Sequence, residues 1–367
     1  MYLNLNDIIV LVGASQGFFL AFLLLLKKDT LKINIPLIVG IILLSLRLVS
    51  DFLYDTEWIV KVVDWVYMLE PFNIALGLCI FLYVRNVIER KAIYNRRDIV
   101  MLIPLFIYFI YYGYYFAKGH EYRVYDVQQY MAEGEGFAED ILCWCAESVI
   151  NGTFLLFTLF ILKKYHIGVR NNYSDIENKE LLSITILVFV LLIFYIIETI
   201  ISIFVISGSF IPEYIYYFVY FGLIALLFSI GYNELIWSKK AVDISPTQER
   251  YKNSSLDIES SKGLSIKLKS FIEQNKPYLD SQLTLKKLAE MIDIQPYVLS
   301  QLINESFDCN FSEFINSYRI EEAKRLLRDP EYKNYTLTAI GFESGFNSKS
   351  AFYIAFKNFT GTTPAKY

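Results

Sequence analysis

Histidine and cysteine are scarce in this chain of 367 residues, and their placement excludes several kinds of site. The two histidines, His120 and His166, have no partner at the spacing that metal ligands on a helix require. The four cysteines show no metal-ligand spacing, and we interpret them as small buried side chains rather than as disulfides or zinc ligands. No glycine-rich phosphate loop and no pairing of a nucleophile with a base is visible. We therefore expect no metal, no other cofactor and no enzymatic activity.

Charged residues are also few, at 20% of the chain, and the formal net charge of −4 is small. Apolar residues make up 55% and aromatic residues 17%, which is more than a soluble domain of ordinary composition carries. The apolar excess lies in the amino-terminal part, whereas charge, Ser, Asn and Gln rise towards the carboxyl terminus. This asymmetry predicts a lipid-embedded domain over 1–237, a hydrated linker over 238–263 and a soluble domain over 264–367.

Seven apolar segments are candidates to cross the hydrocarbon core, which takes about 20 residues. They are Ile8–Leu26, Ile35–Ser50, Trp65–Val84, Ile99–Phe116, Ile141–Leu162, Leu181–Ile206 and Ile211–Trp237. The first ends in Lys27 and Lys28 without a small-residue cleavage site, which indicates a retained span rather than a removed signal peptide. Pro71 lies inside the third segment and predicts a kink there.

Basic residues follow every odd-numbered span. Lys27 and Lys28 follow the first, Arg96 and Arg97 lie after the third, and the fifth and seventh are also followed by lysines. Because short loops rich in Lys and Arg stay in the cytoplasm, the amino terminus is predicted outside and the soluble domain inside.

Several polar residues fall at membrane depth, where they are costly and usually face a bundle interior. Arg47 and Glu147 are explained by a position near the headgroups, which their side chains reach by snorkelling. Glu70 and Glu198 leave two interpretations open: binding of, or response to, a small-molecule or membrane signal, and a structural hydrogen bond between helices.

Two stretches of the soluble domain have the pattern of helix-turn-helix units. In the first, over 283–305, Pro296 suits the first position of the second helix, because its fixed φ is helical and its missing N–H is not needed. The polar face of that helix is predicted to enter the major groove of double-stranded DNA. The residues of this face are Gln295, Tyr297, Ser300, Gln301 and Asn304.

In the second unit, over 337–364, Asn347 or Ser348 caps the last helix and Gly361 ends it. The residues expected to face outwards, towards DNA, are Ser348, Lys349, Ser350, Tyr353 and Lys357. The expected core stripe is Ala351, Phe352, Ala355, Phe356 and Phe359. An amphipathic helix over 312–328 joins the units, and at about 1.5 Å per residue it is long enough to hold two recognition helices about one DNA turn apart.

The soluble domain over 264–367 resembles the DNA-binding domain of the AraC/XylS family of bacterial transcription regulators. The matching residues are Leu283–Ala289, Leu299-Ser300, Arg319-Ile320, Glu322-Ala323, Gly345-Phe346, Phe352, Phe356-Lys357, Gly361 and Pro364. The whole layout is similar to that of membrane-anchored members with a multi-span sensor. The family often has arginine where this chain has Gln301, and usually alanine where it has Gly341. These departures imply a weaker grip on phosphate and a weaker helix.

Together these expectations describe an all-α protein: a seven-helix transmembrane bundle followed by two helix-turn-helix units joined by a long helix. The resemblance implies a regulator in the bacterial cytoplasmic membrane that couples a membrane or extracellular signal to gene expression. Because Lys and Arg barely outnumber Asp and Glu after Leu264, we expect a second copy of the chain to strengthen binding. Two alternatives stay open: a membrane receptor whose helical tail docks a protein partner, and a membrane enzyme or transporter with a regulatory tail.

Overall fold

The computed structural model describes residues 5–28, 30–55, 58–93, 95–96, 98–133, 138–176, 181–206 and 258–367, with parts of 221–229. The chain divides into two bodies, which we describe separately. The bundle comprises Met1–Leu162 and Leu181–Ala241, and the C-terminal body comprises Lys163–Glu180 and Val242–Tyr367. The segment Lys163–Glu180 therefore groups with the C-terminal body, although the sequence placed it within the domain over 1–237.

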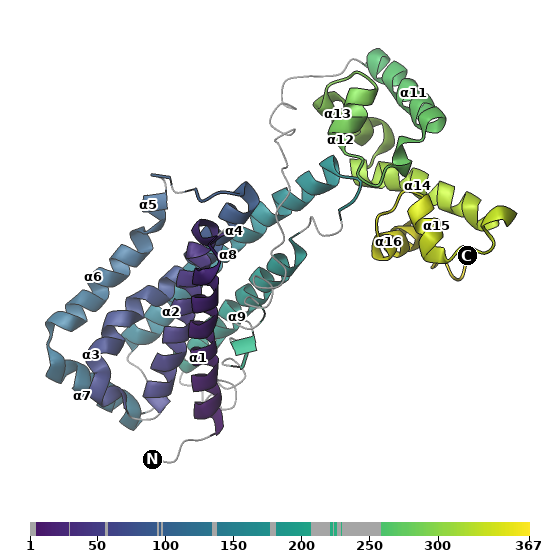
Figure 1. The fold of residues 1–367 in the computed structure, drawn as a ribbon. Helices are drawn as coiled ribbons and strands as arrows, with labels where there is room; N and C mark the ends of the chain where they lie inside the picture. Colours follow the sequence, from purple (N-terminus) through teal and green to yellow (C-terminus); the bar gives the residue numbers. More distant parts are fainter. Residues whose placement is uncertain are drawn as a thin grey trace. The chain divides into compact units, whose positions relative to one another are not determined.

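The described part of the bundle is helical (Figure 1). Its helices are α1 (Leu5–Leu26), α2 (Leu31–Asp55), α3 (Ile59–Leu69), α4 (Leu76–Glu89), α5 (Asp98–Met101), α6 (Ile103–Ala117), α7 (His120–Glu133), α8 (Ala138–Asn172) and α9 (Leu182–Ile206), with a 3-10 turn, η1 (Glu70–Ala75), between α3 and α4. Among the described residues, six helical stretches are long and apolar enough to cross a membrane, and they overlap the first six predicted spans. The seventh, Ile211–Trp237, lies almost wholly outside the described residues.

The outer faces of these helices carry large apolar side chains. Phe19 on α1 is 60% exposed, Phe106 on α6 is 67% exposed and Phe160 on α8 is 66% exposed. Between the helices, α1 packs along α2, and α2 packs against α4 (Figure 1). An apolar surface of this extent is rare on a protein that lies in water.

The kink predicted at Pro71 is confirmed as the 3-10 turn η1. Asn151 on α8 bonds to the backbone within and just after this turn: its Nδ2 donates to the Asn73 carbonyl at 3.2 Å, and its Oδ1 accepts from the Gly77 amide at 2.7 Å. A Cβ at Gly77 would lie 2.7 Å from the Asn151 carbonyl oxygen, so only glycine permits this close crossing of α4 and α8.

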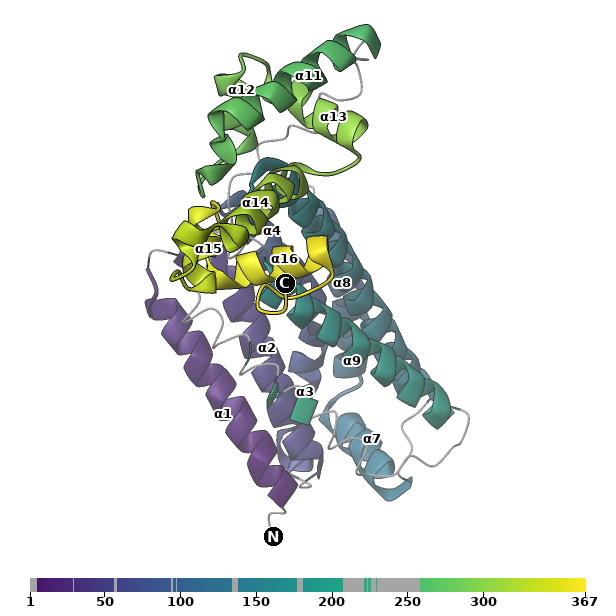
Figure 2. The ribbon, with the colours of Figure 1, turned by 90° about the vertical axis from the view of Figure 1, so that its right-hand side faces the viewer.

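The C-terminal body is also helical, with α14 in the middle (Figure 2). Its helices are α11 (Ile258–Asn275), α12 (Leu285–Met291), α13 (Pro296–Phe307), α14 (Phe311–Arg328), α15 (Leu337–Glu343) and α16 (Lys349–Thr360), with 3-10 turns η3 (Pro277–Leu279) and η4 (Pro330–Tyr332). α11 begins at Ile258, inside the segment predicted as linker, and residues 238–257 of that segment lie outside the described residues.

Each end of α14 belongs to a different hydrophobic core. Phe311, Phe314 and Ile315 join the core formed with α11, α12 and α13. Ile320 and Leu326 join the core formed with α15 and α16. Because one continuous helix contributes to both cores, it connects the two helix-turn-helix units rigidly, as the sequence predicted.

Candidate nucleic-acid interface

The second helix-turn-helix unit presents its predicted outer face on α16. Ser348 is the N-cap, and its side chain accepts a hydrogen bond from the Ala351 amide. Lys349, Ser350 and Lys357 are exposed, as predicted, whereas Ser348 and Tyr353 are partly buried. The Lys349 ammonium lies 5.5 Å from the centre of the Tyr353 ring. α16 therefore carries a cation and hydroxyl groups in its first turn and a second cation, Lys357, in its last turn, which suits contacts with phosphates and base edges.

The core stripe of α16 is confirmed for Phe352, Ala355 and Phe356, which are buried. Ala351 is partly buried. Phe359 was predicted to join the core but is 44% exposed, in the last turn of α16, where Tyr367 packs on Phe356 instead, with the ring centres 5.3 Å apart. The stop itself is as predicted: Gly361 has φ +74°, a conformation that favours glycine.

The close approach of α15 and α16 explains the glycine at position 341. A Cβ there would lie 2.7 Å from Phe352 Cγ. The turn that follows uses Gly345 with φ +93°. Gly341 therefore keeps α16 close to α15, at the cost of a weaker α15.

The first unit presents its predicted face only in part. Pro296 opens α13, and Gln295 forms no side-chain cap, as its chemistry suggests. Gln295 and Asn304 are exposed and Tyr297 is partly buried.

Ser300 and Gln301 do not face outwards: they are 5% and 8% exposed. The Gln301 side chain donates from Nε2 to Glu305 Oε1 at 2.8 Å. The sequence prediction assumed one buried face for α13, whereas the helix packs against α11, α12 and α14, which leaves a narrow exposed strip. The outward placement of Ser300 and Gln301 is thus corrected, and their contact with DNA stays a prediction.

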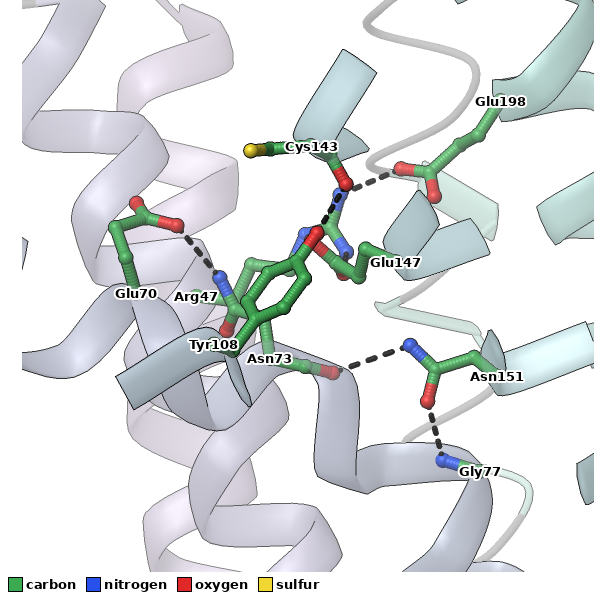
Figure 3. A network of polar contacts seen from close by, with 9 residues as sticks. All are labelled: Arg47, Glu70, Asn73, Gly77, Tyr108, Cys143, Glu147, Asn151 and Glu198. Carbon is green, nitrogen blue, oxygen red and sulfur yellow. Dashed lines mark hydrogen bonds and ion pairs between the residues drawn. The ribbon is translucent and has the colours of Figure 1, made fainter. Parts of the chain in front are cut away.

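In the bundle, a charged cluster joins three helices (Figure 3). Arg47 on α2 binds Glu147 on α8 through Nη1 at 2.8 Å and Glu198 on α9 through Nη2 at 2.6 Å. The exposed fractions of the Arg47, Glu147 and Glu198 side chains are 21%, 7% and 16%. The snorkelling explanation of Arg47 and Glu147 is therefore replaced by a mutual ion pair, which sequence reasoning missed because the partners lie 100 and 151 residues apart.

Glu70 lies in the same network but is not paired with an arginine by a hydrogen bond. It accepts a hydrogen bond from Asn73 Nδ2 at 3.0 Å, at the start of the η1 break (Figure 3). Tyr108 on α6 donates to the Cys143 carbonyl nearby. The structure thus brings Glu70 and Glu198 into one buried polar region, and their role in signalling stays a prediction. Within the described residues, no three His, Cys, Asp or Glu side chains are placed to hold a metal ion.

Comparison with known proteins bears on the C-terminal body. Residues 288–367 match the family described as "Helix-turn-helix domain". Over 90 residues, the chain is 36% identical to an uncharacterized HTH-type transcriptional regulator of Staphylococcus aureus (strain MSSA476), covering 24% of this chain and 12% of the relative. It is 34% identical over 90 residues to the uncharacterized HTH-type transcriptional regulator YobQ of Bacillus subtilis (strain 168), covering 24% of this chain and 36% of YobQ.

Among solved structures, a protein of unknown function from Listeria innocua is 28% identical, covering 28% of this chain and 93% of that protein, with a TM-score of 0.25. The chain thus spans about a tenth to a third of the length of the curated relatives named above, and the similarity covers about a quarter of this chain. The part of this chain that follows α11 and η3 is a helix-turn-helix domain of the kind found in these HTH-type regulators.

Proposed function

We propose that this chain is a membrane-embedded transcription regulator that binds double-stranded DNA with two helix-turn-helix units. The observation that carries the proposal is the architecture of the C-terminal body: α13 and α16 each follow a short helix and a tight turn, and α14 joins them through both cores. At about 1.5 Å per residue, the 18 residues of α14 span roughly 27 Å, which suits two major-groove contacts on one face of a duplex. The AraC/XylS resemblance supports the same arrangement.

The membrane part of the proposal is supported by the six long apolar helices and their exposed aromatic and aliphatic side chains. Basic residues after the odd-numbered spans favour an outer amino terminus and a cytoplasmic C-terminal body. In this proposal the bundle receives a membrane or extracellular signal, and the charged cluster of Arg47, Glu147 and Glu198 is the region that responds.

The DNA proposal is tested with the full chain in a bacterial host, by crosslinking and sequencing the captured DNA. We expect discrete enriched sites for the unchanged protein and loss of that enrichment in a Lys349→Ala, Lys357→Ala double variant. The control is a Lys262→Ala, Lys333→Ala double variant, which removes the same charge at exposed positions outside the recognition helices. Absence of any enriched site for the unchanged protein, at normal abundance, contradicts the proposal.

The membrane proposal is tested separately by topology reporters. A reporter fused after Lys240 is expected in the cytoplasm, and one inserted between Gly119 and Ala138 is expected outside. An external reporter after Lys240 would rule out contact with chromosomal DNA.

A second function, docking of a protein partner by the C-terminal body, is favoured by the burial of Ser300 and Gln301 and by the balanced charge of this body. It predicts that the double variant on α16 leaves the protein's cellular effect intact. Loss of the effect together with DNA enrichment supports the regulator instead.

A further inference from the structure

A short segment that follows α8 lies inside the C-terminal body rather than beside it. Tyr173 forms an antiparallel bridge with Thr284, the residue that caps α12. The Ser174 amide donates to the Leu283 carbonyl at 3.3 Å, and Ser174 Oγ donates to the same carbonyl at 2.7 Å. The segment is thus attached to the entry of the first helix-turn-helix unit.

The same segment also binds the connecting helix α14. Ser312 Oγ donates to the Ser174 carbonyl at 3.3 Å, and Arg319 Nη2 donates to Ser174 Oγ at 3.1 Å. Arg319 is 1% exposed and donates in addition to the carbonyl oxygens of Tyr278 and Asp280. The amide, the carbonyl and the hydroxyl of Ser174 all have partners, and Ser174 is 2% exposed.

The next residue reaches the second unit. Asp175 is 8% exposed, and its Oδ2 accepts a hydrogen bond from Asn347 Nδ2 at 2.5 Å. Asn347 directly precedes Ser348, the N-cap of α16. Tyr173, Ser174 and Asp175 therefore contact both helix-turn-helix units and the helix that joins them. The Asp175 carboxylate also acts on Arg319: burial lowers the pKa of the Arg319 guanidinium to about 10, and the carboxylates of Asp175 and Asp280 oppose this shift.

We propose that Tyr173–Asp175 is a docking segment that occupies a specific site on the helix-turn-helix domain and, while bound, lowers its affinity for DNA. The site consists of Leu283, Thr284, Ser312, Arg319 and Asn347. This inference rests on the proposed function, since it assigns a control element to the same interface.

The charge of the docking segment explains why the bound state opposes DNA. Asp175 holds a carboxylate against Asn347, which directly precedes the N-cap Ser348 and Lys349 at the amino-terminal end of α16, where the DNA backbone is expected. A fixed negative charge there repels phosphate and partly cancels the attraction of Lys349.

The chain also supplies a direct link from the segment to the bundle. α8 is one continuous helix from Ala138 to Asn172, and it carries Glu147 of the charged cluster. No loop separates this helix from Tyr173. α8 therefore offers a covalent route from the Glu147–Arg47 pair to the docking segment that does not use the linker over 238–257.

Docking itself is tested with the full chain in lipid nanodiscs, with the native cysteines replaced. A Tyr173→Cys, Thr284→Cys pair stands at antiparallel bridge positions, whose Cα atoms lie about 4.5–5.5 Å apart, within the range that a disulfide spans. We expect a disulfide to form rapidly under mild oxidation. The mismatched control is a Tyr173→Cys, Lys333→Cys pair. Lys333 is exposed and directly follows η4, away from Thr284 in the sequence, so this pair should stay reduced. Absence of the disulfide in the first pair overturns the docking site.

The effect on DNA is measured with the same protein and a fluorescent 30-base-pair duplex of random sequence. The disulfide form is expected to bind at least about 5-fold more weakly than its reduced form, a typical coupling between sites. The Thr284→Cys single variant measures how far loss of the Thr284 N-cap of α12 alone changes the affinity for DNA. Equal or tighter binding by the disulfide form overturns the inhibitory role.

A charge variant tests the mechanism without a crosslink. Asp175→Asn is expected to bind the duplex several-fold more tightly at low salt, with a difference that shrinks as salt rises. Glu331→Gln removes the same charge at an exposed position and should change binding much less. Equal effects of the two variants would overturn a specific role for Asp175. If no form of the protein binds any duplex, the proposed function fails, whereas the crosslink still reports docking.

Discussion

Arg319 Nη2 donates a hydrogen bond to Ser174 Oγ across 145 residues of sequence. The same guanidinium holds the carbonyl oxygens of Tyr278 and Asp280, and its carbon lies 5.7 Å from the centre of the Phe346 ring. Arg319 therefore connects the docking segment, the first core and the turn of the second unit through one planar group.

Replacing Arg319 with lysine is expected to destabilise the C-terminal body by about 2 kcal/mol or more, because one ammonium cannot reproduce the fixed fork of donors and leaves buried carbonyls unpaired. Thermal unfolding followed by a fluorescent label on the C-terminal body measures this. Arg325→Lys is the matched control, since Arg325 lies on the same helix with a side chain 52% exposed in surface ion pairs. Its effect should stay below about 1 kcal/mol. Equal stability of the two variants would show that Arg319 is not central to this body.

Gly341→Ala is expected to destabilise the second helix-turn-helix unit by about 1–3 kcal/mol, because the added methyl group would meet Phe352 at 2.7 Å. Helix propensity alone predicts the opposite sign, so the measurement separates packing from propensity. Gly263→Ala is the control: Gly263 lies in α11, and an added Cβ meets nothing within 4 Å. That change should stabilise the body by up to about 1 kcal/mol. A stabilising Gly341→Ala would refute the close crossing of α15 and α16.

Glu198→Gln is expected to leave a protein that folds and enters the membrane but whose transcriptional output no longer responds to its stimulus. The amide keeps the shape of the side chain and removes one of the two carboxylates that hold Arg47. A reporter gene fused to a promoter found in the DNA survey measures the response. Glu70→Gln tests the second candidate in the same way, and Glu89→Gln at an exposed position is the control. Normal induction in both Glu198→Gln and Glu70→Gln would assign these residues a structural role.

Lys357→Ala is expected to weaken binding to all duplex sequences alike and to reduce the salt dependence of log K by roughly 0.9, the value for one phosphate contact. Lys357 is exposed on α16, so the loss of its charge should not disturb the core. Lys333→Ala, exposed outside the recognition helices, should leave the slope unchanged. A Lys357→Ala variant with an unchanged slope would place α16 away from the DNA backbone.

The helices of the C-terminal body could be predicted from sequence because their signals are local. The Thr336 and Ser348 hydroxyl groups each accept a hydrogen bond from the backbone amide three residues further along. Gly361 ends α16 with a positive φ. These features depend on four or five consecutive residues, and the apolar period of each helix indicates its buried side. The 3-10 break at Pro71 was predictable for the same reason.

The orientation of polar side chains was less predictable, because it depends on neighbours that are distant in sequence. Gln301 lies on the polar side of α13 by periodicity, but three other helices pack against α13 and leave little of it exposed. Likewise, Arg47 could be placed at membrane depth from sequence, whereas its pairing with Glu198 depends on where α9 lies relative to α2 within the bundle.

The docking segment gave no signal in the sequence. Tyr173–Asp175 has no apolar period, and its partners lie 109 to 172 residues further along the chain. A serine and an aspartate after a basic helix end are common in loops, so only the contacts themselves distinguish this segment.

The segment and its site are also separated in time during synthesis. Asn347 leaves the ribosome 172 residues after Asp175, which at roughly 5–20 residues per second is a delay of about 9–34 seconds. The Ser174 backbone partners Leu283 and Ser312 are translated within that interval, 109 and 138 residues after Ser174, whereas the hydrogen bond from Asn347 to Asp175 comes only at its end. Residues translated much later thus complete a structure begun by the segment after α8, so ribosomes that stop before Asn347 release proteins in which the Asp175 carboxylate lacks its Asn347 partner.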